Sequence, residues 1–257
     1  VSETVHPETR KVLSTFLRYR GIACEVLPMK NGVTDMEMLE GKVSRETAGV
    51  ILQSPNFFGF FEDIGNAEKI THNKKGLLIL SVDPISLGLF KSPGEWGADI
   101  AIGEGQSLGN PMSFGGPYLG FLACTKSLMR KMPGRIVGQT RDTEGKRGFV
   151  STLQTREQHI RREKATSNIC SNESLNALAA SVYLATMGKE GLKEVARQCY
   201  DKAHYAASIL TASGKYHLLY DHPFFMEFPV VGTPSDEKIQ EALLQEAIIG
   251  GYAFQKD

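Results

Sequence analysis

The sequence predicts an α/β protein whose sheet is parallel or mixed and is covered by helices. Three short, mostly apolar segments lie at residues 49–53, 77–82 and 99–102. Strands of this kind are typical of a sheet that is buried on both faces. Segments with helical spacing of apolar residues separate them, so we expect a layered α/β domain whose ligands bind beyond the carboxyl ends of the strands.

The N-terminal part is expected to add two helices and a strand. Residues 7–19 place apolar side chains on one helical face, and residues 22–27 indicate a strand. Residues 34–43 predict a second helix, for which Thr34 or Asp35 supplies the cap. These elements precede the first apolar strand.

The second half of the chain is expected to be mainly helical until its character changes after Gly214. The expected elements are a strand at 118–124, a hairpin of 135–139 with 148–153, helices at 156–164, 174–187 and 190–213, strands at 216–220 and 224–228, and a helix at 235–246. We therefore assign residues 1–188 to part of a large domain, and residues 189–257 to a linking helix and the beginning of a small C-terminal α/β domain.

Composition and charge argue against several classes of protein. Lys plus Arg and Asp plus Glu both number 29, so net charge gives no long-range attraction to nucleic acid or to an anionic membrane. No apolar run approaches the ~18 residues that a membrane helix needs. The four cysteines form no CxxC pair, which argues against a zinc ribbon and favours a reduced, cytoplasmic protein. Residues 1–4 look like the end of a strand, so we expect a piece of a longer protein.

A glycine-rich loop follows the third apolar segment. It reads GEGQSLGNPMSFGGPYLGF from Gly103 to Phe121, and Gln106 at its head can neither ionise nor attack. Its backbone amides are suited to cradling a phosphate, but the loop matches neither the P-loop nor the dinucleotide-binding pattern. The alternative is a tight loop that needs positive φ angles, and the loop taken alone favours this alternative.

Two further candidates lie at strand ends. Asp83 follows an apolar strand, where its carboxylate either pairs with a cationic ring nitrogen, holds a metal-bound water, or caps the Asp83-Pro84 turn. Position alone does not choose between a ligand role and a capping role. Ser54-Pro55-Asn56 ends the preceding strand. No pair of histidines has metal-ligand spacing, and His159 is expected to be solvated.

Two other segments have both a plain and a functional interpretation. The four phenylalanines between residues 57 and 61 are expected to serve packing or subunit contact rather than cofactor binding. The basic segment 156–164 is typical of a solvated helix face. It gains interest because it runs into 165–168, where hydroxyls and free amides at the start of the next helix suit an anion.

Five segments together resemble the glycine cleavage system P-protein family, in its subunit 1 form. They are SETVHPETR at 2–10, QSPNFFG at 53–59, GEGQSLG at 103–109, FGGPYLGF at 114–121 and REKATSNIC at 162–170. The resemblance covers essentially the whole chain, and several of the motifs are long enough to be very specific.

The resemblance implies the aspartate-aminotransferase-like fold type I of pyridoxal-phosphate-dependent transferases. In that fold a strand-end Asp pairs with the pyridine nitrogen and a later lysine forms the Schiff base. Asp83 matches the first position, and Gln106 stands where the lysine belongs. Because an amide nitrogen is not basic, it cannot hold the cofactor covalently. Lys91 and Lys126 are poor substitutes, so the resemblance implies that pyridoxal 5'-phosphate is held by the partner, P-protein subunit 2.

By the same resemblance, this chain completes the partner's site. Thr166, with Ser167 and Asn168 beside it, matches the segment that reaches the cofactor phosphate across the dimer interface in related enzymes. The implied function is that of a glycine dehydrogenase (decarboxylating) subunit, which with its partner decarboxylates glycine and passes the aminomethyl group to lipoylated H-protein. A heterotetramer with two copies of each subunit is implied.

Two alternatives stay open at this stage. The chain is a structural or regulatory pseudoenzyme that contacts no cofactor, or it is an independent pyridoxal-phosphate lyase or desulfurase that uses another lysine. The second alternative predicts that the isolated chain is yellow and that borohydride fixes the cofactor on one of its lysines. We expect neither alternative to hold.

Overall fold

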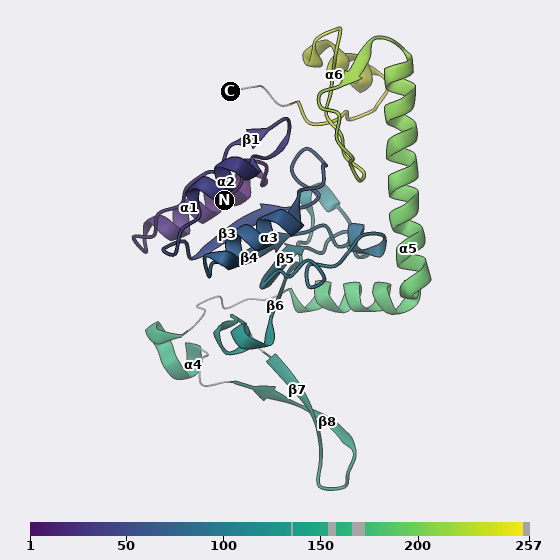
Figure 1. Ribbon diagram of the computed structural model, residues 1–257. Helices are drawn as coiled ribbons and strands as arrows, with labels where there is room; N and C mark the ends of the chain where they lie inside the picture. The colour runs from purple at the N-terminus through teal and green to yellow at the C-terminus, as the bar shows by residue number, and fades with distance from the viewer. Residues whose placement is uncertain (135, 154–157, 166–172, 254–257) are drawn as a thin grey trace.

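A four-stranded mixed sheet forms the centre of the molecule. The computed structural model describes residues 1–134, 136–153, 158–165 and 173–253 (Figure 1). The strands lie in the order β3-β4-β5-β6, with the first three parallel and β6 antiparallel to β5. Their bounds are β3 (Gly49–Gln53), β4 (Leu77–Ser81), β5 (Ile100–Glu104) and β6 (Gly120–Cys124). The predicted strands at 49–53, 77–82, 99–102 and 118–124 are thereby confirmed to within two residues at each end.

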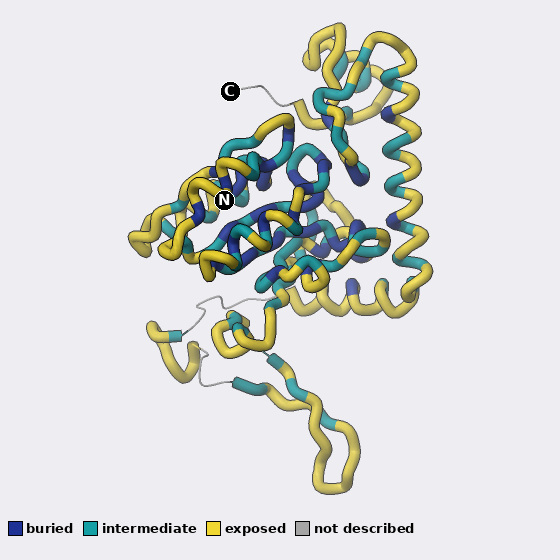
Figure 2. The backbone as a smooth tube through the Cα atoms, viewed as in Figure 1, coloured by how far each residue is buried: buried dark blue, intermediate teal, exposed yellow. Residues whose placement is uncertain are grey.

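One face of this sheet carries the main hydrophobic core. Leu52, Leu78 and Leu80 are fully buried, and Leu39 and Ala67 pack against them from two helices. Burying one leucine side chain stabilises the fold by about 1.5–3 kcal/mol. Alternate residues of β3 and β4 are only half-buried, and the dark blue segments of Figure 2 accordingly gather along the central strands.

Three helices accompany the first half of the chain: α1 (Pro7–Arg18), α2 (Met36–Lys42) and α3 (Ile64–Asn73). Asp35 caps α2 by accepting hydrogen bonds from the amides of Glu37 and Met38, so Asp35 rather than Thr34 is the cap. A small antiparallel pair, β1 (Met29–Lys30) with β2 (Val33–Thr34), precedes α2.

The strand predicted at 22–27 is wrong. Only Leu27 pairs, in an isolated bridge to Ser2. Ser2 also donates its amide to the carbonyl of Ile51 in β3. The first residues of the chain therefore occupy the place beside β3 that a strand at 22–27 would need.

An excursion leaves the body of the molecule after β6. It contains the antiparallel hairpin of β7 (Ile136–Arg141) and β8 (Arg147–Thr152), which projects away from the central sheet in Figure 1. The hairpin is therefore confirmed. The helix predicted at 156–164 is described only as α4 (Gln158–Arg161) and the 3-10 turn η5 (Arg162–Lys164), because residues 154–157 lie outside the described part.

A long bent helix, α5 (Ser174–Ala212), runs along the body and leads to the last elements. It bends at Gly188, which has φ 59° and ψ −171°. The two predicted helices, 174–187 and 190–213, are therefore one element with a break. The bend lies at the predicted domain boundary of 188 and 189, although the division into domains remains a prediction. None of the helices in the described ranges is both long and apolar enough to cross a membrane.

The C-terminal elements are β9 (Tyr216–Leu218), β10 (Val230–Gly232) and α6 (Asp236–Gln245). The strand predicted at 224–228 is wrong, because β9 pairs with β10. Phe224 instead stacks on His204 and forms an isolated bridge to Phe60. The backbone bridge, together with the hydrophobic cluster that Phe60 and Phe224 share, holds the segment 223–228 against the loop that follows β3.

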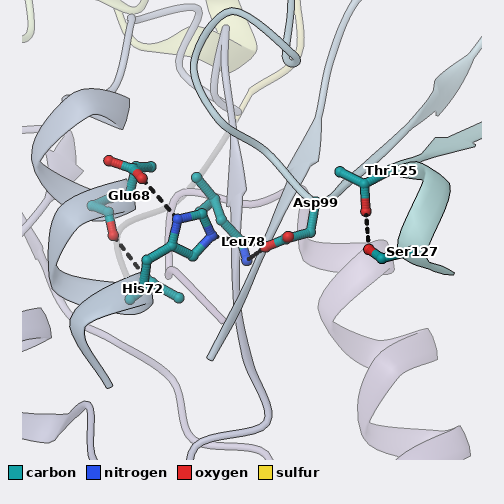
Figure 3. A network of polar contacts seen from close by, with 8 residues as sticks. Glu68, His72, Leu78, Asp99, Thr125 and Ser127 are labelled. Carbon is teal, nitrogen blue, oxygen red and sulfur yellow. Dashed lines mark hydrogen bonds and ion pairs between the residues drawn. The ribbon is translucent and has the colours of Figure 1, made fainter. Parts of the chain in front are cut away.

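A polar contact joins α3 to the amino ends of β4 and β5. His72 lies between two carboxylates, with Nδ1 2.7 Å from Glu68 and Nε2 2.9 Å from Asp99 (Figure 3). The same oxygen of Asp99 accepts the amide of Leu78. The hydrogen bond to Asp99 raises the pKa of His72, and Glu68 raises it further.

This contact predicts a pH dependence of stability. Because the folded pKa is raised above the ordinary value, the stabilisation by His72 is complete below about pH 6.5 and is lost as pH rises through the folded pKa. We expect His72→Gln to lower the Tm more at pH 5.5 than at pH 8.5. Thermal unfolding at both pH values tests this, with the exposed His159→Gln as the control. An equal Tm loss at both pH values would contradict it.

Candidate functional site

A cavity of about 380 Å³ opens at the carboxyl ends of the central strands. Gln53 and Asp83 reach it from the ends of β3 and β4, and Glu104 reaches it from the end of β5. Met226 and Glu227 close it from the C-terminal segment, and His6 completes one side. The cavity therefore lies where the α/β architecture predicts a ligand site.

Asp83 caps a turn, and its side chain also lies at the cavity. Its carboxylate accepts the amide of Ser86 at 2.9 Å, while the Ser86 hydroxyl donates to the Asp83 carbonyl at 2.7 Å. It thus caps the turn that leads into the 3-10 helix η1 (Ser86–Gly88). The same side chain lines the cavity.

The charges around Asp83 have one sign. Burial raises the pKa of Asp83, although hydrogen bonds from the backbone of Ser86 and Ile85 oppose this shift. Burial, and then the charge of Asp83, raises the pKa of Glu227. Two carboxyl groups with raised pKa values therefore face one cavity, which favours a bound proton or cation and disfavours an anion.

The loop after β3 is held by a buried polar network. Asn56 donates to the carbonyl of Gly32 at 2.9 Å and to Glu62 at 2.8 Å, and its oxygen accepts the amides of Phe58 and Phe60. Ser54-Pro55-Asn56 therefore lies at the cavity edge, where Pro55 lines it, but Asn56 is committed to the loop. Glu62 was not predicted as a buried residue, because Asp63 follows it directly and the sequence does not show which of the two neighbouring carboxylates is buried.

Gly59 brings this loop into contact with the C-terminal segment. Its φ is +86°, and a Cβ atom there would overlap the carbonyl of Glu227. The amide of Phe225 donates to the Gly59 carbonyl at 3.1 Å. The close approach needs glycine, and it places Glu227 at the cavity.

Phe60 and Phe61 lie in hydrophobic clusters, which confirms packing as their role.

Gln106 lies apart from this cavity. The described residues that line the cavity include Glu104 but not Gln106. The Gln106 amide group instead donates to the carbonyls of Pro111 and Pro117 within its own loop. Of the two residues, Asp83 lines this cavity and Gln106 does not.

The other candidate residues lie outside the described residues or on the surface. Thr166, Ser167 and Asn168 lie outside the described residues. His159 is exposed on α4, as predicted. Among the residues that the structure describes, no group of three or more His, Cys, Asp or Glu side chains is arranged to hold a metal ion.

A site that holds pyridoxal phosphate needs a carboxylate for the ring nitrogen, an amine for the covalent bond and a cation for the phosphate. The described lining of this cavity supplies the first of these and lacks the other two. Asp83 supplies a carboxylate for a cationic ring nitrogen. No lysine or arginine is among the described residues that line the cavity, so it offers no amine for a covalent bond and no cation for a phosphate. Its three carboxylates, from Asp83, Glu104 and Glu227, would repel a phosphate. The residues present do not fit covalently held pyridoxal phosphate.

Comparison with known proteins gives consistent results. The family model "Glycine cleavage system P-protein" matches residues 1–257. The probable glycine dehydrogenase (decarboxylating) subunit 1 of Moorella thermoacetica is 54% identical over 252 residues, which are 98% of this chain and 57% of that protein. The counterpart from Carboxydothermus hydrogenoformans is 55% identical over 256 residues, again 57% of its length. The chain therefore spans somewhat more than half the length of these relatives.

Solved structures agree on the fold. A crystal structure of glycine decarboxylase (P-protein) of the glycine cleavage system, in inhibitor-bound form, matches with a TM-score of 0.92 and 44% identity, over 97% of this chain and 56% of that one. More distant structures of 15–16% identity match with TM-scores of 0.60–0.64 and show the fold alone. The predicted fold type I, aspartate-aminotransferase-like, is confirmed. The chain belongs to the glycine cleavage system P-protein family.

Proposed function

We propose that this chain is part of subunit 1 of a glycine dehydrogenase (decarboxylating), and that it works only with a partner subunit. Relatives that are 54–55% identical carry that subunit name. The complete complex would decarboxylate glycine and transfer the aminomethyl group to lipoylated H-protein. The absence of lysine and arginine from the described lining of the acidic cavity carries the central part of the proposal, namely that the covalent chemistry takes place in the partner.

The partner, P-protein subunit 2, would hold pyridoxal 5'-phosphate. When bound, this cofactor supplies an electron sink for the electron pair that remains when CO₂ leaves the substrate. Gln106 stands at the family's lysine position in this chain, and an amide cannot replace the amine. Asp83 keeps the carboxylate of the ancestral site but uses it to cap the turn before η1.

This chain would contribute a rigid half of the interface. Thr166, Ser167 and Asn168 would donate hydrogen bonds to the cofactor phosphate in the partner's site, since they precede α5 and match the family's phosphate segment.

The location and the assembly of the complex are further parts of the proposal. Cys24, Cys124 and Cys199 are free thiols, which supports a cytoplasmic location. Two copies of each subunit would form a heterotetramer.

The phosphate contact predicts a loss of cofactor affinity. We expect Thr166→Ala in the full-length subunit to weaken binding of pyridoxal phosphate to the reconstituted complex by roughly tenfold to a hundredfold, because a hydrogen bond to a charged group contributes about 1.5–3 kcal/mol. Cofactor titration and glycine–CO₂ exchange measure it. Thr15→Ala, on the exposed surface of α1, is the control. Unchanged affinity and exchange would rule out the phosphate contact.

A second prediction concerns Asp83. Because burial raises its folded pKa, ionising it costs stability, and this cost appears as pH rises from about 3.8 through the folded pKa. Asp83→Asn should therefore raise the Tm at pH 7, by an amount that shrinks as pH falls toward 4. The same variant should leave the rate of glycine–CO₂ exchange by the complex unchanged. The exposed Asp201→Asn serves as control. Loss of exchange without loss of stability would show that this cavity holds the cofactor ring.

A further inference from the structure

The loop that contains Gln106 is closed at its base by Glu104. One carboxylate oxygen of Glu104 accepts the amide of Gln106 at 2.9 Å and the amide of Leu119 at 2.7 Å. The amide of Gly105 donates to the carbonyl of Leu119 at 2.7 Å. The outgoing and returning limbs of the loop are therefore joined where they leave β5 and enter β6.

Gln106 joins the same two limbs higher in the loop. Its Nε2 atom donates to the carbonyl of Pro111 at 3.4 Å and to the carbonyl of Pro117 at 3.2 Å. Gly116 makes room for this contact, because a Cβ atom there would lie 2.6 Å from Nε2 and would overlap the carbonyl of Met112. Two carbonyl oxygens converge on one nitrogen, so the position requires a hydrogen-bond donor.

The braced loop is attached to the beginning of α5. The Asn176 side chain donates to the carbonyl of Tyr118 at 2.9 Å, next to Pro117. The Asn110 side chain donates to the carbonyl of Asn176 at 3.5 Å, next to Pro111. The two residues whose carbonyls accept from Gln106, Pro111 and Pro117, are therefore direct chain neighbours of Asn110 and Tyr118, which both contact Asn176.

Packing reinforces this attachment. Leu108 of the loop and Ala180 of α5 are buried in one hydrophobic cluster, against which Leu119 and Tyr183 pack. The Tyr183 ring also covers Gly109 closely. The loop is therefore joined to the first turns of α5 both by hydrogen bonds and by hydrophobic packing.

We propose that Gln106 is a positioning residue that fixes the first turn of α5 through the limbs of its loop and the side chains of Asn110 and Asn176. On this view the side chain at the lysine position is more than the remnant of a lost function, because it sets where the chain enters α5. The consequence for the enzyme rests on the proposed function, in which the residues before α5 serve the partner's site.

Hydrogen exchange of the full-length subunit tests the coupling independently of catalytic activity. The probe is the amide of Ala177, which donates to the Glu173 carbonyl in the first turn of α5. We expect Gln106→Met and Gln106→Glu to accelerate its exchange by roughly fivefold, since the two long hydrogen bonds from Nε2 are lost. Gln106→Lys keeps a donor and should retain the wild-type rate. Gln240→Met is the matched control, because Gln240 Nε2 donates to the Gly251 carbonyl.

A double-mutant cycle tests the path. Gln106→Met combined with Asn176→Ala should exchange no faster at Ala177 than Asn176→Ala alone, because both act through one connection. Additive effects, or an unchanged Ala177 rate in Gln106→Met, would overturn the proposal.

The reconstituted complex distinguishes positioning from simple folding. Gln106→Met and Asn176→Ala should weaken cofactor affinity by the same factor at unchanged Tm, and Gln106→Lys should restore the affinity. Unchanged cofactor affinity in Gln106→Met would overturn the positioning role in the enzyme. If the wild-type complex shows no glycine–CO₂ exchange, the proposed function fails, while the Ala177 result still decides the coupling.

Discussion

The arrangement of the site depends on the hydrogen bonds that the buried carboxylate of Glu62 accepts. Thr4 and Asn56 donate to one of its oxygens and the amide of Thr34 to the other, at 2.7–2.9 Å. A buried charge costs several kcal/mol unless its hydrogen-bonding capacity is met. Because the donors come from three separate segments, the network fixes the loop after β3. That loop carries Gly59, which holds the C-terminal segment over the strand ends and so shapes the cavity.

The cavity that results is acidic, and this charge supports the proposal that the covalent chemistry takes place in a partner subunit. Asp83 lies at the strand end, Glu104 and Glu227 share the cavity with it, and no lysine or arginine is among the described residues that line it. Such a site suits a proton or a small cation better than a phosphorylated cofactor. The glycine-rich loop is held by Gln106, which donates to two of its carbonyls, and the loop packs on α5.

Sequence patterns predicted the central strands well, because β3 and β4 are short apolar segments whose alternate residues are buried. They missed α3, although Asp63 caps it and Ile64, Ala67 and Thr71 occupy one buried face. The error at 224–228 has a tertiary cause, since Phe224 packs on His204 instead of pairing as a strand. At the site, the position of Asp83 was predictable. The like charges around it and the bonds of Gln106 were not, because they depend on segments far apart in the sequence.

The central claim is that this chain leaves the covalent chemistry to its partner. The direct measurement is borohydride reduction of the reconstituted complex with pyridoxal phosphate, followed by peptide mass spectrometry of both chains. The account predicts that the reduced cofactor is attached to a lysine of subunit 2 and to none in this chain. Stoichiometric attachment to a lysine of this chain, such as Lys91 or Lys126, would contradict it.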